Sequence, residues 1–98
     1  MQFRSYHQTD IMGDRAHVVY AVLLENKHGR KWVYVGQTKD YHTRISQHKA
    51  GEVYSTSGSR VIKYLRLKTK LTRRQAESWE RYYVRLRRSR SGYPVFGM

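Results

Sequence analysis

Five side chains in this sequence could act together on a phosphate group: Tyr20, Tyr34, Arg44, His48 and Glu80. The planar guanidinium of an arginine can clamp a phosphate through two parallel hydrogen bonds. A lone carboxylate can anchor Mg²⁺ while most of the ion's ligands stay water and phosphate oxygen. Arg44 and His48 are four residues apart, so on a helix their polar ends can meet at one place. These residue types therefore suit phosphodiester hydrolysis, with Arg44 as the clamp and Glu80 as the anchor.

Taken one at a time, the same residues also have ordinary structural explanations. Tyr20 and Tyr34 lie in apolar runs, where tyrosines are commonly core residues with a satisfied hydroxyl. His48, near the end of a predicted helix, could be a cap or a surface group, and Glu80 could offset nearby arginines. What favours a shared site is their order along the chain: two strand tyrosines, a helical arginine and a later helical glutamate.

This order resembles the GIY-YIG nuclease family. Residues 18–20 (Val-Val-Tyr) followed by residues 34–38 (Tyr-Val-Gly-Gln-Thr) look like the two signature strands of that family. Residues 39–48 resemble its first helix, with Arg44 ten residues after the second signature tyrosine. Glu80 resembles the metal-binding glutamate of the family. The similarity extends over nearly the whole chain and is most specific in the second strand and Arg44.

The resemblance implies a role for each candidate. Tyr20 would help to activate the attacking water, and Tyr34 would position or polarise the attacking group. Charges from nearby Arg, Lys and metal are expected to lower the tyrosine pKa values, because an ordinary phenol is a poor base at neutral pH. His48 would be a proton relay or a phosphate ligand. Tyr54 falls where family members often carry a histidine or tyrosine near the active site.

The metal site and the edges of the motif leave alternatives open. The resemblance implies Mg²⁺, or Mn²⁺ in its place, held by Glu80, while Glu77 lies one turn earlier and competes for that role. Val18 stands where the first motif has a glycine, and Pro94 stands where members often have an asparagine. These two departures favour the alternative of a nucleic-acid-binding module that has lost catalysis.

The elements that must position these residues can be predicted from periodicity and capping signals. The apolar residues 18–25 and 31–36 predict two strands joined as a hairpin. Asp40 and Thr72 are suitable N-caps for helices over residues 41–49 and 73–88. The later helix has a buried stripe of Ala76, Trp79, Tyr83 and Leu86, with Glu80 at its margin.

Other segments are less regular. Residues 61–67 fit a short helix about as well as a strand, and we favour the helix, followed by a very short third strand at 68–71. The apolar tail over residues 91–96 is expected to pack back on the domain. The sequence thus predicts a small α/β (α+β) domain of GIY-YIG type. Its short, mostly antiparallel sheet has about three strands, flanked by about three helices. This domain covers residues 18–98, after an N-terminal extension over residues 1–17.

The charge of the chain points to a polyanionic partner. Lys and Arg exceed Asp and Glu by 20 to 7, giving +13, and residues 60–90 alone hold twelve basic and two acidic residues. Nucleic acid relieves such self-repulsion through its phosphates, and a membrane surface fits less well because no helix shows a clean apolar face. The predicted nucleic-acid contacts are Lys39, Lys49, Arg60, Lys63, Arg66, Arg73, Arg74 and Arg81.

Composition narrows the class of protein further. The 98 residues suffice for one domain, and the absence of cysteine excludes a disulfide scaffold and a thiol nucleophile. Without a signal peptide or membrane span, the expected location is the cytoplasm of a bacterium or of a phage-infected host. Together with the charge of the chain, the resemblance to the GIY-YIG family implies a metal-dependent endonuclease of phage or mobile-element type that cuts DNA, double-stranded in the first instance. Its sequence selectivity would be low or shape-based, or would come from a homodimer or a protein partner. A basic, RNA-binding structural protein is a third hypothesis.

Overall fold

The computed structural model describes residues 15–97 of the chain. Its elements, in order, are β1 (His17–Asn26), β2 (Lys31–Thr38), α2 (Tyr41–Lys49), the 3₁₀ turn η2 (Tyr54–Thr56), β3 (Ser59–Leu71), α3 (Arg73–Arg90) and β4 (Val95–Gly97). The predicted α+β class is confirmed, with four strands and two α-helices in this part of the chain rather than about three of each. The predicted N-terminal extension lies outside the described residues up to position 14, and β1 begins at His17.

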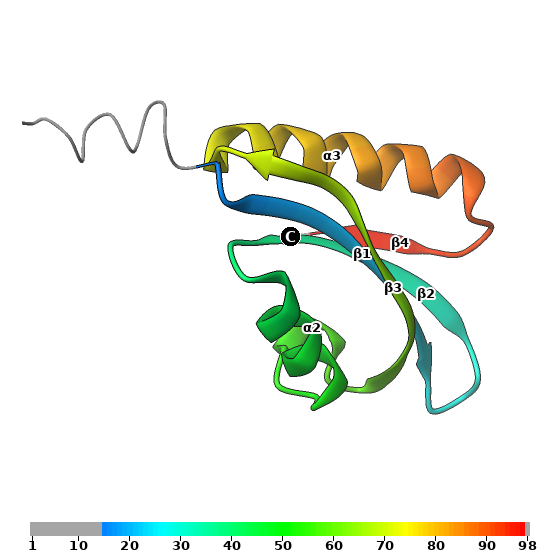
Figure 1. Ribbon diagram of the computed structural model, residues 1–98. Helices are drawn as coiled ribbons and strands as arrows, with labels where there is room; N and C mark the ends of the chain where they lie inside the picture. Colours follow the sequence, from blue (N-terminus) through cyan, green and yellow to red (C-terminus); the bar gives the residue numbers. More distant parts are fainter. Residues whose placement is uncertain (1–14, 98) are drawn as a thin grey trace, which may run out of the picture.

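The four strands form one mixed sheet in the order β3-β1-β2-β4. β1 pairs antiparallel with both β2 and β3, whereas β4 runs parallel to β2. The β1–β2 turn is closed by Asn26, whose side-chain oxygen accepts from the backbone N–H groups of His28 and Arg30. Figure 1 shows α3 on one face of the sheet and α2 on the other.

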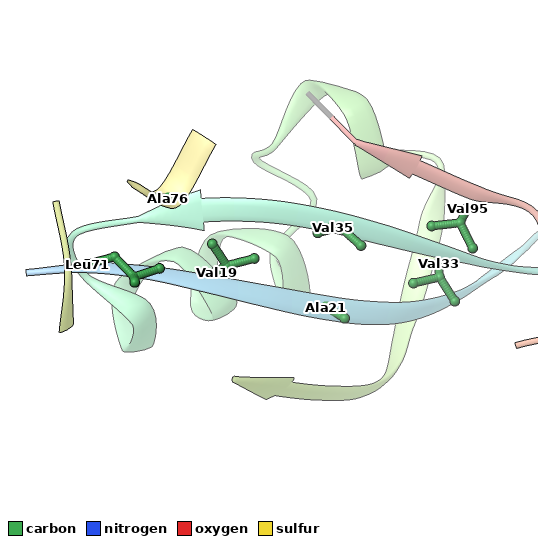
Figure 2. Packing of buried hydrophobic residues seen from close by; sticks show 7 residues of the cluster. All are labelled: Val19, Ala21, Val33, Val35, Leu71, Ala76 and Val95. Carbon is green, nitrogen blue, oxygen red and sulfur yellow. The ribbon is translucent and has the colours of Figure 1, made fainter. Parts of the chain in front are cut away.

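Each face of the sheet carries its own core. On the α3 side, the buried residues are Val19, Ala21, Val33, Val35, Leu71, Ala76 and Val95 (Figure 2). On the α2 side, they are Tyr20, Val22, Leu24, Tyr34 and Ile45. Successive side chains of β1 therefore alternate between two buried faces, which explains why this strand is nearly all apolar. The same alternation directs both signature tyrosines toward α2.

Both predicted helices and their caps are confirmed. Asp40 accepts from the backbone N–H of Thr43 at 3.2 Å, and Thr72 forms a capping box with Gln75. The predicted stripe of α3 is correct in direction, because Ala76 is buried and Trp79 packs against the core. No helix within residues 15–97 has both the length and the apolar character needed to cross a membrane.

The helix predicted over residues 61–67 is wrong. This segment belongs to β3, a strand of thirteen residues that also absorbs the short strand predicted at 68–71. Its register against β1 shifts three times, and each irregularity disrupts the simple alternation that marks a strand in a sequence. Pairing with β3 is favourable because β1 has β2 on one side only, and its remaining backbone N–H and C=O groups gain partners along β3.

The prediction that residues 91–96 pack back on the domain is confirmed, and the structure adds a strand there. Val95 is buried against the α3-side core, and the carbonyl of Pro94 accepts from the N–H of Val33 at 2.8 Å. β4 ends at Gly97, opposite Val35. The last residues of β2 therefore extend beyond β4, and the site is built around that end.

Candidate active site

Tyr20 and Tyr34 lie side by side at the centre of the site, with ring centroids 6.4 Å apart. Gly36 pairs with Tyr20 across the β1–β2 ladder and has no side chain to separate the two rings. A Cβ atom at this position would lie 2.7 Å from the Tyr20 hydroxyl oxygen and 2.8 Å from Cε2 of Tyr34. The glycine of the second signature strand is therefore required for the two tyrosines to approach each other.

A chain of buried hydrogen bonds runs from Tyr20 through His48 to Thr56. The Tyr20 hydroxyl lies 2.8 Å from Nε2 of His48, and Nδ1 of His48 lies 2.8 Å from Oγ1 of Thr56. The Thr56 hydroxyl donates to the carbonyl of Val53 at 3.4 Å, so this oxygen is left to accept from Nδ1–H of His48. From this network we infer that Nε2 of His48 is unprotonated and accepts a hydrogen bond from the Tyr20 hydroxyl.

Burial keeps the side chains of His48, Tyr20 and Tyr34 neutral. It lowers the pKa of His48 to about 4, with a further contribution from the Arg44 guanidinium. Burial also raises the pKa values of Tyr20 and Tyr34, and the Glu80 carboxylate adds to both effects. Arg44 acts in the opposite direction on both tyrosines without outweighing burial. The expected lowering by positive charge is therefore present, but the net pKa shift of both tyrosines is upward because burial is the larger effect.

Glu80 reaches the site from the α3 side of the sheet. Its side chain is buried, and its Oε1 accepts from Nε2 of Gln37 at 3.2 Å. Gly97 lets α3 approach closely, since a Cβ there would lie 2.6 Å from Cγ2 of Val84 and 3.5 Å from Oε2 of Glu80. Glu77 is exposed and lies 3.7 Å from Arg73 across one helical turn. The structure thus brings Glu80, and not Glu77, to the tyrosines.

The donor set fits a hard cation with few protein ligands. Within the described range, no three His, Cys, Asp or Glu residues cluster in a way that could hold a metal ion. One buried carboxylate beside a bound phosphate is the arrangement that suits Mg²⁺, which keeps several waters. A tetrahedral zinc site would need several nitrogen or sulfur ligands instead.

The family model of the GIY-YIG catalytic domain matches residues 16–93, more than three quarters of the chain. The chain belongs to the GIY-YIG family. No curated protein and no solved structure matches it. The GIY-YIG domain is a nuclease domain whose family acts on DNA and generally depends on a divalent metal. The strands and the first helix that suggested the family from the sequence lie within the matched region.

One candidate stands apart from this GIY-YIG site, and three neighbours of the site were not predicted. The side chain of Tyr54 is 95% exposed in η2, so the structure does not bring it to the other residues. Its neighbour Ser55 lies beside Tyr34 instead, and its side chain acts to lower the pKa of that tyrosine against the larger effect of burial. Thr56 and Gln37 were also missed. No motif marks Ser55 or Thr56, but Gln37 follows the signature glycine directly.

The predicted nucleic-acid contacts of this GIY-YIG domain lie in the β2–α2 connection, at the end of α2, on β3 and on α3. Nearest the tyrosines, the guanidinium of Arg66 lies 4.7 Å from the ring centroid of Tyr41, which itself packs against Tyr20. Lys49 lies 4.7 Å from the ring centroid of Tyr64, and Arg81 directly follows Glu80.

The remaining predicted contacts differ in how strongly they are already engaged. Arg60 is paired with Glu25 at 2.6 Å, and Arg73 lies near Glu77. Lys39, Lys63 and Arg74 are exposed. Because a pairing carboxylate competes with phosphate, we expect Arg60 and Arg73 to contribute less to contacts with DNA than the exposed Lys63 and Arg74.

Proposed function

We propose that this GIY-YIG protein is a metal-dependent endonuclease that hydrolyses phosphodiester bonds in DNA. The observation that carries the proposal is the hydrogen bond between the Tyr20 hydroxyl and the buried, neutral Nε2 of His48. A merely structural tyrosine needs a partner for its hydroxyl, but it does not need a base. The effects of Arg44 and Glu80 on the pKa of Tyr20 support the proposal, because both charges must lie near the same oxygen.

Phosphate binding would fall to Arg44 and to a metal ion at Glu80. Arg44 is half-buried on α2 and would present its planar guanidinium fork to a phosphate. Glu80 would hold Mg²⁺, or Mn²⁺ in its place, and the bound ion would neutralise charge that builds up on the phosphate. The hydrogen bond from Gln37 to Oε1 orients the Glu80 carboxylate within the site.

The proton path follows the observed hydrogen bonds. As water attacks phosphorus, its proton passes to the Tyr20 oxygen while the Tyr20 hydroxyl proton passes to Nε2 of His48. One P–O bond forms, the P–O bond to the departing sugar oxygen breaks, and that oxygen takes a proton from solvent. His48 then carries two protons, keeps its Nδ1–H bonded to Thr56, and returns the Nε2 proton through Tyr20 to solvent, because burial favours the neutral ring. This exchange avoids a free tyrosinate, which the raised pKa of Tyr20 disfavours.

Tyr34 would orient the water or a phosphate oxygen, with Ser55 beside its side chain. The exposed ring of Tyr54 would contact the substrate rather than take part in the chemistry. Grip on duplex DNA would come from phosphate contacts by the basic residues of β3 and α3, without sequence readout. One such site cuts one strand, so a monomer would nick DNA and a homodimer could break both strands.

A catalytically inactive nucleic-acid-binding module is the second candidate. It is favoured by the raised pKa values of both tyrosines, since neither is a ready base at neutral pH. The two functions differ in their dependence on metal. Binding through basic side chains needs no divalent ion, whereas cleavage through Glu80 does.

The test uses supercoiled plasmid at low salt, with Mg²⁺ or with EDTA, and a matched pair of variants. Glu80→Ala removes the buried carboxylate, and Glu77→Ala removes an exposed one from the same helix. The endonuclease predicts nicking that needs Mg²⁺, survives in Glu77→Ala and is lost in Glu80→Ala. Plasmid that stays intact in Mg²⁺ while a gel shift shows it bound would instead establish the inactive module.

A further inference from the structure

A groove that shares Tyr34 with the active site lies beside it. It encloses about 530 Å³ on the α2 side of the sheet and runs along β2 and β4 from Trp32 to Tyr34. Phe96, Pro94 and Ser55 complete its walls. Pockets for small organic groups have volumes of this order. Because Tyr34 belongs to both, a group bound in the groove lies directly next to the site of cleavage.

The groove is built from aromatic rings on neighbouring strands. Trp32 and Tyr34 are two residues apart on β2, and Phe96 pairs with Tyr34 across the β2–β4 ladder, so all three project from the same face. The rings of Trp32 and Phe96 are 5.7 Å apart and inclined at 75°. Phe96 is 53% exposed, so much of its ring is open to a ligand.

The orientation of Trp32 is fixed by its surroundings. Its indole N–H donates to the Ser59 hydroxyl at 3.0 Å. The ring therefore forms a rigid wall, and a ligand that stacks in the groove does not first have to order it. Preorganised aromatic surfaces of this kind bind planar groups by stacking.

The rim of the groove is cationic. Arg30 and Lys31 are exposed and line it where the β1–β2 turn meets β2. The nearby carboxylate of Glu25 is engaged by Arg60 at 2.6 Å. An aromatic floor with a positive rim matches a nucleotide, which has a flat base and an anionic phosphate. An apolar peptide would match the floor but would gain nothing from the rim.

We propose that this groove binds one unpaired nucleotide of the DNA substrate, beside the phosphate that is cut. The base would stack on the exposed ring of Phe96 and contact Trp32, whose ring is inclined at 75° to that of Phe96, and its phosphate would lie near Arg30 and Lys31. A base within a duplex cannot bind in this way, because its faces are covered by its neighbours. The inference rests on the proposed function, and it gives the enzyme a preference for DNA with a flap, bubble or frayed end.

The test measures binding in EDTA, where DNA stays intact, with the full chain. The probes are a short duplex and the same duplex with an unpaired segment of a few nucleotides containing 2-aminopurine, whose fluorescence falls when it stacks. The variants are Phe96→Leu, which keeps an apolar side chain, and Phe96→Ala. Tyr82→Ala is the matched control, because Tyr82 is an aromatic residue of similar exposure on α3, away from the groove.

The wild type and Tyr82→Ala should quench the probe and bind the partly unpaired DNA more tightly than the duplex. Phe96→Leu should abolish most of the quenching and weaken binding of the unpaired DNA by about tenfold, with duplex affinity changed less than about twofold. Quenching retained in both Phe96 variants would overturn the inference, as would an equal loss of affinity for both DNAs.

Failure of the groove and failure of the proposed function are distinguishable. If Phe96→Leu shows the selective loss but wild-type protein never nicks DNA with Mg²⁺, the groove is supported and the endonuclease is refuted. If wild-type protein nicks DNA but Phe96→Leu quenches and binds as the wild type does, the groove inference alone is refuted.

Discussion

Gly36→Ala should disable the site while leaving the fold largely in place. The added Cβ would lie 2.7 Å from the Tyr20 hydroxyl oxygen, whereas ordinary contact needs about 3.4 Å. Tyr20 is 1% exposed, so its ring can move only by displacing its neighbours. A shift of roughly 0.7 Å away from Gly36 would stretch or bend the 2.8 Å bond to His48 beyond useful geometry.

The free-energy cost can be worked from these contacts. Overpacking in a buried site costs about 1–3 kcal/mol, and a weakened buried hydrogen bond adds about 1 kcal/mol. Alanine would recover about 0.5–1 kcal/mol by restricting the unfolded chain. The net loss of about 2 kcal/mol corresponds to a fall in Tm of roughly 10 °C for a domain of this size. Loss of the relay should lower the rate of cleavage by about 10²-fold or more.

The assay is the rate of plasmid nicking in Mg²⁺, with thermal unfolding followed by circular dichroism. Gly58→Ala is the control, because a Cβ at Gly58 meets no atom within 4 Å and its backbone has no positive φ. We expect this variant to match the wild type in Tm and rate. A Gly36→Ala protein that cuts at the wild-type rate would refute the reasoning, since the relay would then not depend on the close approach of the tyrosines.

Three further results are expected. Because folding lowers the pKa of His48 from 6.5 to about 4, the unfolded chain binds a proton before the folded chain does as the pH falls. The free energy of unfolding should therefore decrease by at most about 3 kcal/mol from pH 6.5 to pH 4, and His48→Gln should flatten this part of the pH profile measured by urea unfolding. Thr56→Val removes the acceptor that fixes the His48 tautomer and should slow cleavage about tenfold or more, whereas Thr56→Ser should cleave near the wild-type rate. Equal rates for both variants would contradict the tautomer assignment. DNA affinity should fall steeply between about 50 and 200 mM salt, and Arg66→Ala should reduce the slope of log affinity against log salt by about one. Arg60→Ala should reduce the slope less, because Arg60 is already paired with Glu25, and identical slopes for the two variants would contradict this ranking.

The sequence predicted the elements where local signals agree with the final packing. The β1–β2 hairpin, the Asp40 and Thr72 caps and the direction of the α3 stripe follow from patterns of a few residues. The prediction for residues 61–67 was wrong because the β-bulges remove the period-two pattern of a strand, and because the strand that pairs with this segment lies about forty residues earlier in the chain. β4 was not predicted as a strand because three residues of parallel pairing leave almost no local pattern.

The order of residues in the sequence predicted which residues form the site, but it did not predict how deeply they are buried. Tyr20, Tyr34, His48 and Glu80 are brought to one end of β2, as the spacing of motifs suggested. The sign of the tyrosine pKa shift was not predictable, because burial depends on how closely α2 packs on the sheet. Thr56 and Ser55 enter through a loop whose path is set by tertiary contacts with His48 and Tyr34.

The measurement that tests the account most directly is single-turnover cleavage of labelled DNA in Mg²⁺ by Tyr20→Phe. This variant removes one oxygen and keeps the ring that fills the core. Tyr64→Phe is the control, since its hydroxyl accepts from Lys49 at 3.3 Å on the surface of the same sheet. We predict that Tyr20→Phe binds DNA within about twofold of the wild type but cuts it about 10²-fold more slowly, with Tyr64→Phe unchanged in rate. A Tyr20→Phe protein that folds, binds and cuts as the wild type does would contradict the central claim that Tyr20 and His48 move the proton during cleavage.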